Sequence, residues 1–382
     1  MLAYRYSRRG ALFASALLLA VPVSGSELKL HGQASGWLGA GRDVSYFEQT
    51  GLRYIPTLSL SLPFRLDAEA SVNAYESAVN RDWDFDGFNF TTTVKPYRLW
   101  LRYSTSRLEA RAGLQKINFG SATLLRPLQW FDRVDPRDPL GLTDGVYGLL
   151  ARYYFQDNSN IWAWGLLGNS SPKGWEQFGT ERWAPEPGAR VQIPIPRGEV
   201  AGTYDHRTFD YTGVVIPEML DEQAEDRFGF DAKVDLGVGF CLEGMLSRQT
   251  RRLVEGEDSP IWSRAAVVGV DYTVGLGSGI GAAAEHLFAG SANEPFGRGT
   301  DAQFSALMIS YPIDLLDNLR GIVFFDWVGH RPYSYVAWQR TLDNWVFSVA
   351  AFWYPDRPAV IPGQAAGGAA GKGLQVTVVF NH

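Results

Sequence analysis

The chain has 382 residues, a net charge of −6 and one cysteine, Cys241. An acidic chain without basic runs gives no basis for nucleic-acid binding, and a lone cysteine excludes an internal disulfide or a cysteine-based metal site. Aromatic residues make up 14% of the chain and glycines number 41, although the average hydropathy is mildly hydrophilic. That combination favours many short strands over a bundle of apolar helices.

Residues 1–25 have the layout of a secretory signal peptide. Arg5, Arg8 and Arg9 precede an apolar run, Ala11 to Val21, which is followed by small residues. The run is too short to span a bilayer. We therefore expect export, with cleavage after about Gly25 or Ser26, and a mature chain of residues 26–382.

Alternation of apolar and polar residues continues through the mature chain. In the run from Arg227 to Leu236, for example, Phe228 and Phe230 alternate with charged side chains. A period of two predicts strands with one apolar and one polar side. The alternating segments number 18 and are Leu28–Leu38, Arg53–Leu62, Arg65–Tyr75, Val94–Tyr103, Arg107–Lys116, Val146–Phe155, Ile161–Gly168, Ala189–Ile195, Glu199–Asp205, Arg227–Leu236, Phe240–Gln249, Trp262–Val274, Ile280–Ala289, Ala302–Tyr311, Leu319–Val328, Ser334–Arg340, Trp345–Tyr354 and Gly373–Phe380.

Short turns alternate with long loops between these segments, which is typical of an outer-membrane barrel with periplasmic turns and extracellular loops. In lipid every backbone polar group needs an internal partner, so the sheet must close on itself. We therefore predict an all-β, transmembrane antiparallel barrel of about 18 strands. The long loops include Ser77–Thr93, Ile117–Gly145, Asn169–Gly188, His206–Asp226 and Pro355–Lys372.

Aromatic residues near strand ends are expected to form the girdles that such barrels carry at both membrane interfaces. These are Trp37, Tyr54, Trp100, Tyr153, Trp162, Trp164, Trp262, Tyr311, Trp327, Trp345 and Trp353.

A barrel of this width leaves an aqueous channel, so its function depends on the side chains that line and narrow the lumen. Three consecutive strands carry a largely basic polar side, and guanidinium groups bind carboxylate or phosphate through two donors at once. This patch predicts a preference for anionic solutes, and the alternative is a set of ion pairs that brace the wall. Its members are Arg98, Arg102, Arg107, Glu109, Arg111, Lys116 and Arg152.

The connection Ile117–Gly145 is too long for a structureless loop in a compact domain, and its apolar and aromatic residues need burial. We expect it to fold into the lumen beside the basic patch as a constriction loop; the alternative is a cap lying outward over the mouth. The residues expected to shape the constriction are Arg126, Trp130, Asp132, Arg133, Asp135, Arg137 and Asp138.

The same segment resembles the alginate-export-type porins of Gram-negative bacteria. The resemblance rests on Arg111-Ala112-Gly113-Leu114-Gln115, Asn118-Phe119-Gly120, Arg126-Pro127 and Asp135-Pro136-Arg137-Asp138-Pro139, about 40 of 382 residues. It implies an 18-stranded channel with a basic lumen in the outer membrane. Such a channel would let anionic solutes or acidic saccharides pass.

An outer-membrane hydrolase is the enzymatic alternative. His206 has Asp205 and Asp210 nearby in sequence, but no histidine has a convincing nucleophile or a metal-ligand spacing. We therefore expect no enzymatic activity, cofactor or metal. A catalytic role would require His206 to lie within hydrogen-bonding distance of a carboxylate at the outer rim.

A third possibility is a barrel that surrounds or partners another protein in secretion or electron transfer. A wide, open lumen would support it, and a loop closing the lumen would oppose it. The expected partners are outer-membrane lipid and small anionic solutes, with a homo-oligomer or a periplasmic partner left open.

Overall fold

The computed structural model describes residues 26–43, 45–81, 87–209, 223–249, 261–355 and 371–382, so the proposed signal peptide lies outside it. These residues form one short 3-10 turn, η1 (Pro63–Arg65), and 18 strands. The strands are β1 (Glu27–Arg42), β2 (Tyr46–Leu62), β3 (Leu66–Arg81), β4 (Asn89–Ser104), β5 (Leu108–Gln115), β6 (Val146–Tyr154), β7 (Asn160–Leu166), β8 (Glu186–Ile195), β9 (Gly198–Thr208), β10 (Ala224–Asp235), β11 (Gly239–Gln249), β12 (Trp262–Val274), β13 (Ile280–Ala292), β14 (Thr300–Pro312), β15 (Asp317–Asp326), β16 (Arg331–Leu342), β17 (Trp345–Trp353) and β18 (Lys372–Asn381).

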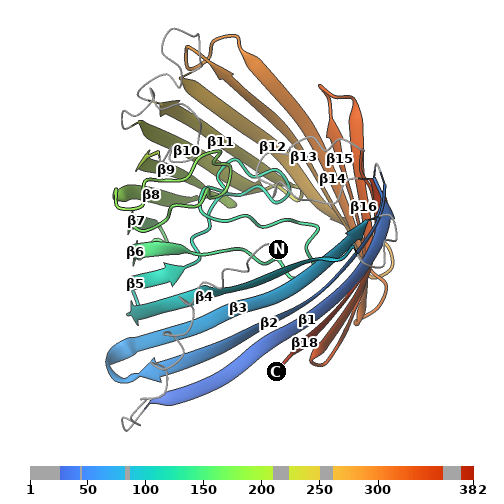
Figure 1. Cartoon of the computed structure of the whole chain (residues 1–382). Helices are drawn as coiled ribbons and strands as arrows, with labels where there is room; N and C mark the ends of the chain where they lie inside the picture. The colour runs from blue at the N-terminus through green and yellow to red at the C-terminus, as the bar shows by residue number, and fades with distance from the viewer. Residues whose placement is uncertain (1–25, 44, 82–86, 210–222, 250–260, 356–370) are drawn as a thin grey trace, which may run out of the picture.

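Each strand pairs antiparallel with the next, and the last strand pairs with the first. The β1–β18 ladder runs from Gln33 opposite Asn381 to Arg42 opposite Lys372, so the sheet closes into the barrel of Figure 1. The predicted closed, antiparallel, 18-stranded barrel is confirmed. Among the described residues, no helix is long and apolar enough to cross a membrane.

Several strands extend further than the alternation predicted. Strands β3 and β4 continue into the expected loop Ser77–Thr93, where Ser77 pairs with Thr91, and β2 begins at Tyr46 instead of Arg53. Alternation marks a strand only where one face meets lipid. Beyond that band apolar residues such as Phe47 and Phe90 are isolated among polar ones, so backbone pairing continues without a visible period of two.

Alternation divides the side chains of every strand between the two surfaces of the barrel. In β4, Leu99 and Leu101 point outward and are about half exposed, whereas the alternate residues Arg98 and Arg102 point inward. The outward surface is therefore apolar and suited to lipid, while the inward surface carries most of the charge.

Four of the expected girdle tryptophans prove to face the interior. Trp37 lies against the Arg53 guanidinium, Trp100 against Arg111, and Trp162 and Trp164 pack on Phe119 inside the barrel. Each of the four occupies an inward position of its strand. The girdle was predicted only from the position of these residues near strand ends. Whether a side chain points to lipid or to the lumen depends on the alternation along the strand. By contrast, Trp327, Trp345 and Trp353 are exposed, as a lipid-facing girdle requires.

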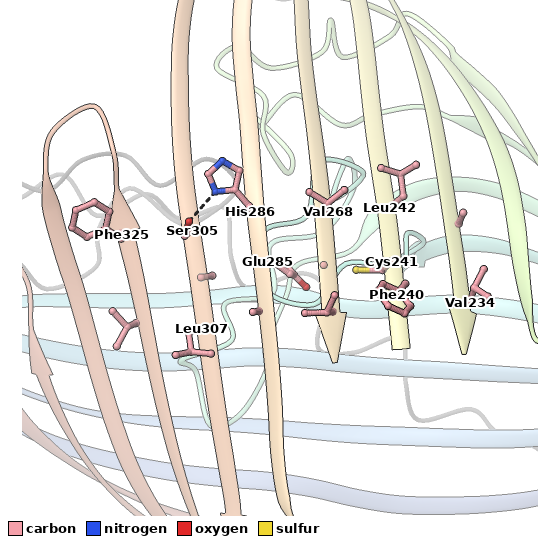
Figure 2. A pocket seen from close by; sticks show the side chains of 16 residues that line it. Val234, Phe240, Cys241, Leu242, Val268, Glu285, His286, Ser305, Leu307 and Phe325 are labelled. Atoms are coloured by element: carbon pink, nitrogen blue, oxygen red, sulfur yellow. Dashed lines mark hydrogen bonds between the residues drawn. The ribbon is translucent and has the colours of Figure 1, made fainter. Parts of the chain in front are cut away.

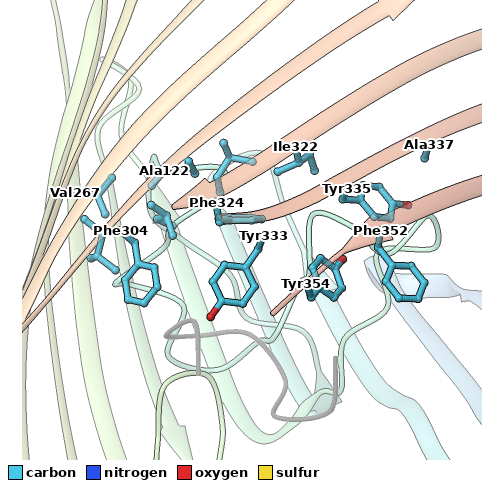
Figure 3. Close-up of a cluster of buried hydrophobic side chains, with 14 of the residues drawn as sticks. Ala122, Val267, Phe304, Ile322, Phe324, Tyr333, Tyr335, Ala337, Phe352 and Tyr354 are labelled. Carbon is cyan, nitrogen blue, oxygen red and sulfur yellow. The ribbon is translucent and has the colours of Figure 1, made fainter. Parts of the chain in front are cut away.

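One half of the interior is densely packed. Inward side chains of β12–β17, including Phe304, Phe324 and Tyr333, form an apolar cluster with Ala122 and Leu124, which come from the segment between β5 and β6. Figure 3 shows this cluster, with Ala122 beside Phe304 and Phe324. The wall and a chain segment inside it thus share one hydrophobic core.

Candidate functional site

The segment between β5 and β6, residues 116–145, lies inside the ring of strands (Figure 1). Its direction is fixed where β5 ends, because the buried Gln115 amide donates to the carbonyl oxygens of Arg111 and Gly148. From there the chain leaves the wall and turns into the lumen.

Two carboxylates of the opposite wall bind the backbone of this segment. Glu285 on β13 accepts hydrogen bonds from the consecutive amides of Thr123, Leu124 and Leu125 at 2.6, 3.0 and 2.6 Å. In the ring of 18 strands, β13 is eight strands from β5 in one direction and ten in the other. The segment therefore crosses the interior and is held on the far side.

The second carboxylate, Glu243 on β11, accepts the amides of Ala122 at 2.9 Å and Leu128 at 2.5 Å. Gly120 permits this approach, because its φ is +100° and a Cβ there would lie 2.6 Å from the Glu243 carboxylate. Hydrogen bonds between a carboxylate and backbone amides are about twice as strong as neutral ones. Together the two glutamates bind five backbone donors that would otherwise need water.

Aromatic and aliphatic side chains of the segment pack against the wall of β6 and β7. Phe119 stacks on Trp164 with ring centroids 5.8 Å apart and meets Trp130 edge-on at 5.5 Å. Ile117 and Trp130 are almost completely buried. Burial of side chains this large contributes roughly 1.5–3 kcal/mol each, so the loop is part of the core.

The charged residues of the segment are largely paired within it. Arg126 contacts Asp132 at 3.4 Å, and Arg137 contacts Asp135 at 2.7 Å. Burial raises the pKa of Asp138, and hydrogen bonds from the Leu140 and Leu142 amides partly offset that rise. Arg133 joins the segment to the loop between β7 and β8, because its guanidinium donates to the carbonyl oxygen of Gly174, 3.0 Å away. These contacts tie the segment together, while Arg133 and Asp138 make no ion pair among the described residues.

Members of the predicted basic patch lie on the inner faces of β4, β5 and β6. Arg102 pairs with Asp67 at 2.9 Å, and Arg111 pairs with Glu109 at 3.0 Å. Arg152 lies 3.8 Å from the Trp162 ring centroid. The patch therefore contains both arginines paired with carboxylates and an arginine that packs against an aromatic ring.

Three further contacts locate the rest of the patch. Arg98 donates to the Thr143 carbonyl oxygen at 3.0 Å and so joins the wall to the loop. Lys116 follows β5, where burial lowers its pKa while Asp132 opposes the shift. Arg107 was predicted within the strand, but it lies exposed in the turn before β5. Its polar neighbours extended the alternation one residue too far.

Sequence reasoning missed Arg53 on β2. Its guanidinium lies over the rings of Trp37 and Tyr75, 5.6 and 4.9 Å from their centroids. Arg53 also lines a chamber of about 440 Å³ between the loop and the wall of β16–β18, β1 and β2. Its position between Leu52 and Tyr54, both exposed on the outer face, was the available signal. The loop side of the chamber is formed by Asp135, Arg137, Asp138, Pro139 and Leu140.

A larger hollow of about 840 Å³ lies on the outside of β10–β15 (Figure 2). Its lining includes Leu242, Val268 and Leu307, which are among the exposed apolar residues of the lipid-facing surface. His286 shares a hydrogen bond of 2.8 Å with the Ser305 hydroxyl there. This hollow faces lipid and is separate from the lumen.

His206 meets the distance condition for a catalytic pair, but with Asp226 at 2.9 Å instead of its sequence neighbours. Tyr204 donates to the same carboxylate oxygen at 2.7 Å, while Asp205 points to the opposite side of the wall. Within the described residues, no group of three metal-binding side chains occurs. The Asp226 carboxylate thus accepts the Tyr204 hydroxyl and pairs with His206 on the outer side of the wall.

No family model matches the sequence, and no curated protein sequence matches it. Among solved structures, the barrel is similar to OccAB1 of Acinetobacter baumannii, with 7% identity, a TM-score of 0.55 and coverage of 94% of this chain and 97% of that chain. It is also similar to OccK5 (OpdH) of Pseudomonas aeruginosa, with 11% identity, a TM-score of 0.54 and coverage of 93% and 98%. At such identities the likeness shows the fold alone.

The shared fold is a large closed antiparallel β-barrel, and the apolar outer surface of this one suits lipid, as in the barrels of bacterial outer membranes. The barrel is therefore located in the outer membrane. The finer resemblance to alginate-export-type porins stays a prediction.

The first prediction concerns the carboxylates that hold the loop. Replacing Glu285 with Gln should weaken the contact with three amides, because the neutral side chain accepts hydrogen bonds less strongly. We expect loop opening to become roughly tenfold or more frequent, from a cost of about 1–3 kcal/mol. Trypsin should then cleave after Arg133 faster than in the native barrel.

Asp157→Asn is the matched control, because Asp157 lies in an exposed short turn and binds only Ser159. Equal cleavage rates in E285Q, E243Q and the control would show that these glutamates do not hold the loop.

Proposed function

We propose that the protein is an outer-membrane channel through which small anionic solutes diffuse. The observation that carries the proposal is an incompletely filled lumen whose open side is lined with arginines. The segment 116–145 packs into the half of the interior formed by β6, β7 and β11–β17. The chamber beside Arg53 and the inner faces of β4–β6 supply the remaining path.

The arginines of this path differ in how their charge is matched. Arg102 and Arg111 are balanced by carboxylates. Arg53, Arg98 and Arg152, in contrast, have no carboxylate within 4 Å among the described residues. Three guanidinium groups that make no ion pair with a described carboxylate favour an electropositive path. Such groups can exchange water for the carboxylate or phosphate of a passing solute.

The loop serves as the constriction in this proposal. Asp135, Arg137 and Asp138 form the side of the chamber opposite Arg53. Arg137 lies over the Tyr354 ring, 5.3 Å from its centroid, and is thereby fixed to the wall. A rigid loop facing a wall arginine would set both the size and the charge of the narrowest passage.

The remaining alternatives are weaker on structural grounds. A tethered loop across the interior argues against a barrel that encloses another protein. The resemblance to alginate-export-type porins supports acidic saccharides as one class of small anionic solute. A homo-oligomer or a periplasmic partner remains a proposal.

Reversal potentials in planar bilayers with asymmetric KCl test the proposal. The native channel should prefer chloride. Replacing Arg98, Arg102 and Arg111 with Gln should lower the anion-to-cation permeability ratio by roughly fivefold, because three lost charges near the path are worth about 1 kcal/mol. Arg107→Gln in the exposed turn is the control. A native preference for potassium, or a triple variant with unchanged selectivity, would contradict the proposal.

A separate prediction concerns Arg53. The variant Arg53→Gln should reduce the anion preference by about twofold, since one charge without a carboxylate partner is removed from the chamber. Arg65→Gln, in the turn between β2 and β3, provides a matched change away from the lumen. If both variants behave like the native channel in the same bilayer assay, the solute path does not pass Arg53.

A further inference from the structure

A buried cluster of charged side chains lies on the inner face of β8, β9 and β10, beneath the loop of residues 167–185. All of its members are less than 10% exposed, and they are Lys173, Glu176, Glu186, Asp205, Arg207, Glu225 and Arg227. The cluster has no role in the proposed solute path.

Most members are closely paired. Lys173 lies 3.0 Å from Glu186 and 3.2 Å from Glu176. Glu225 receives Arg207 at 2.7 Å and Arg227 at 2.8 Å. The two arginines also reach Glu176, at 3.3 and 3.0 Å. These contacts join the loop to three strands.

The charges do not balance. Among the described residues, the cluster holds four carboxylates but only three cations, so one negative charge is in excess if every member is ionised. Arg133 reaches the loop from residues 116–145 through the Gly174 carbonyl oxygen, but it is only partly buried and makes no ion pair with a described carboxylate. The adjacent buried pair, Arg190 and Asp231 at 2.6 Å, is neutral by itself. Glu181 and Arg182, elsewhere on the loop, have opposite signs and lie nearer to solvent. A buried, uncompensated charge is strongly unfavourable.

Two oxygen atoms carry the excess negative charge. Asp205 Oδ2 and Glu186 Oε1 are buried and have no hydrogen-bond donor among the described residues. The other Asp205 oxygen accepts from the Trp164 indole at 3.0 Å, and the nearest guanidinium, Arg227, is 3.9 Å from Oδ2. Glu186 lies on β8 two residues before Gly188, which pairs with Asp205 on β9, so the two buried carboxyls are neighbours on the inner face. By contrast, Glu225 accepts three side-chain donors.

We propose that the Asp205–Glu186 pair binds one proton at neutral pH. A single positive charge makes the cluster neutral, whereas a divalent cation would reverse the excess. Calcium and magnesium also take six or more oxygen ligands, and the pair offers two unbonded oxygens. A proton needs one oxygen to carry it and one to accept the hydrogen bond.

The proton links the stability of the barrel to pH. In an unfolded chain both carboxyls are ionised above about pH 5, so the folded protein holds one proton more. Stability then falls as the pH rises, and the unfolding equilibrium constant increases about tenfold per pH unit until the folded pair releases its proton. The loop of residues 167–185, which contributes Lys173 and Glu176, should loosen on the alkaline side.

Two variants with the same chemical change make a sharp test in the complete barrel in detergent micelles. Asp205→Asn mimics the protonated acid without having to bind a proton, so it should unfold at a higher temperature than the native protein at pH 7, and by a larger margin at pH 9. Glu225→Gln removes a charge that two arginines require, so it should be destabilised at both pH values. Infrared spectra at pH 7 should show the carbonyl band of a protonated carboxyl, which D205N and E186Q each weaken.

Other outcomes would overturn the proposal. Loss of stability in D205N equal to that in E225Q would mean that Asp205 is ionised. A protonated-carboxyl band unaffected by either substitution would place the proton elsewhere. Stability that follows sodium concentration at fixed pH would assign the site to a metal ion. None of these results depends on whether the barrel conducts anions.

Discussion

The requirement that every backbone amide and carbonyl find a partner without help from water determines the rest of this structure. A sheet in hydrocarbon meets it only by closing on itself, and the ladder between β1 and β18 completes the closure. Closure also gives the barrel an outer and an inner surface, and successive side chains of each strand point alternately to one and the other. An odd or even position in a strand decides whether a residue meets lipid or the lumen, and therefore whether charge is tolerated there.

This alternation places most charged side chains inside the barrel, where a folded loop displaces much of the water. Those charges must find partners among themselves or in the backbone. Glu243 and Glu285 take the second course and bind five loop amides, while Arg207, Arg227 and Glu225 take the first. The same electrostatic demand thus produces both the attachment of one loop and the network beneath another.

Local pattern was sufficient for the strand count, the closure and the inward direction of Arg102, Arg111 and Arg152, because each follows from a period of two. It could not reveal that Glu285 binds residues about 160 positions earlier in the chain, since a carboxylate that accepts backbone amides requires no particular partner side chain. The local pattern also could not show that Asp205 points inward to the buried charged cluster while His206 points outward to Asp226. That distinction requires the strand positions. The strand ends were also missed, because alternation disappears where apolar residues are isolated among polar ones.

The lumen has a packed half and an open half because its charged side chains have different partners in the two. Where a carboxylate or backbone group matches each charge, side chains are buried, the loop is held and water is excluded. Where arginines such as Arg53 and Arg152 are held by aromatic rings instead, their guanidinium donors remain available. A ring fixes the position of a cation without neutralising it, so the open half can be ordered and electropositive together. An anion-selective passage requires both properties, because a flexible or neutralised arginine would give neither a defined width nor a persistent field.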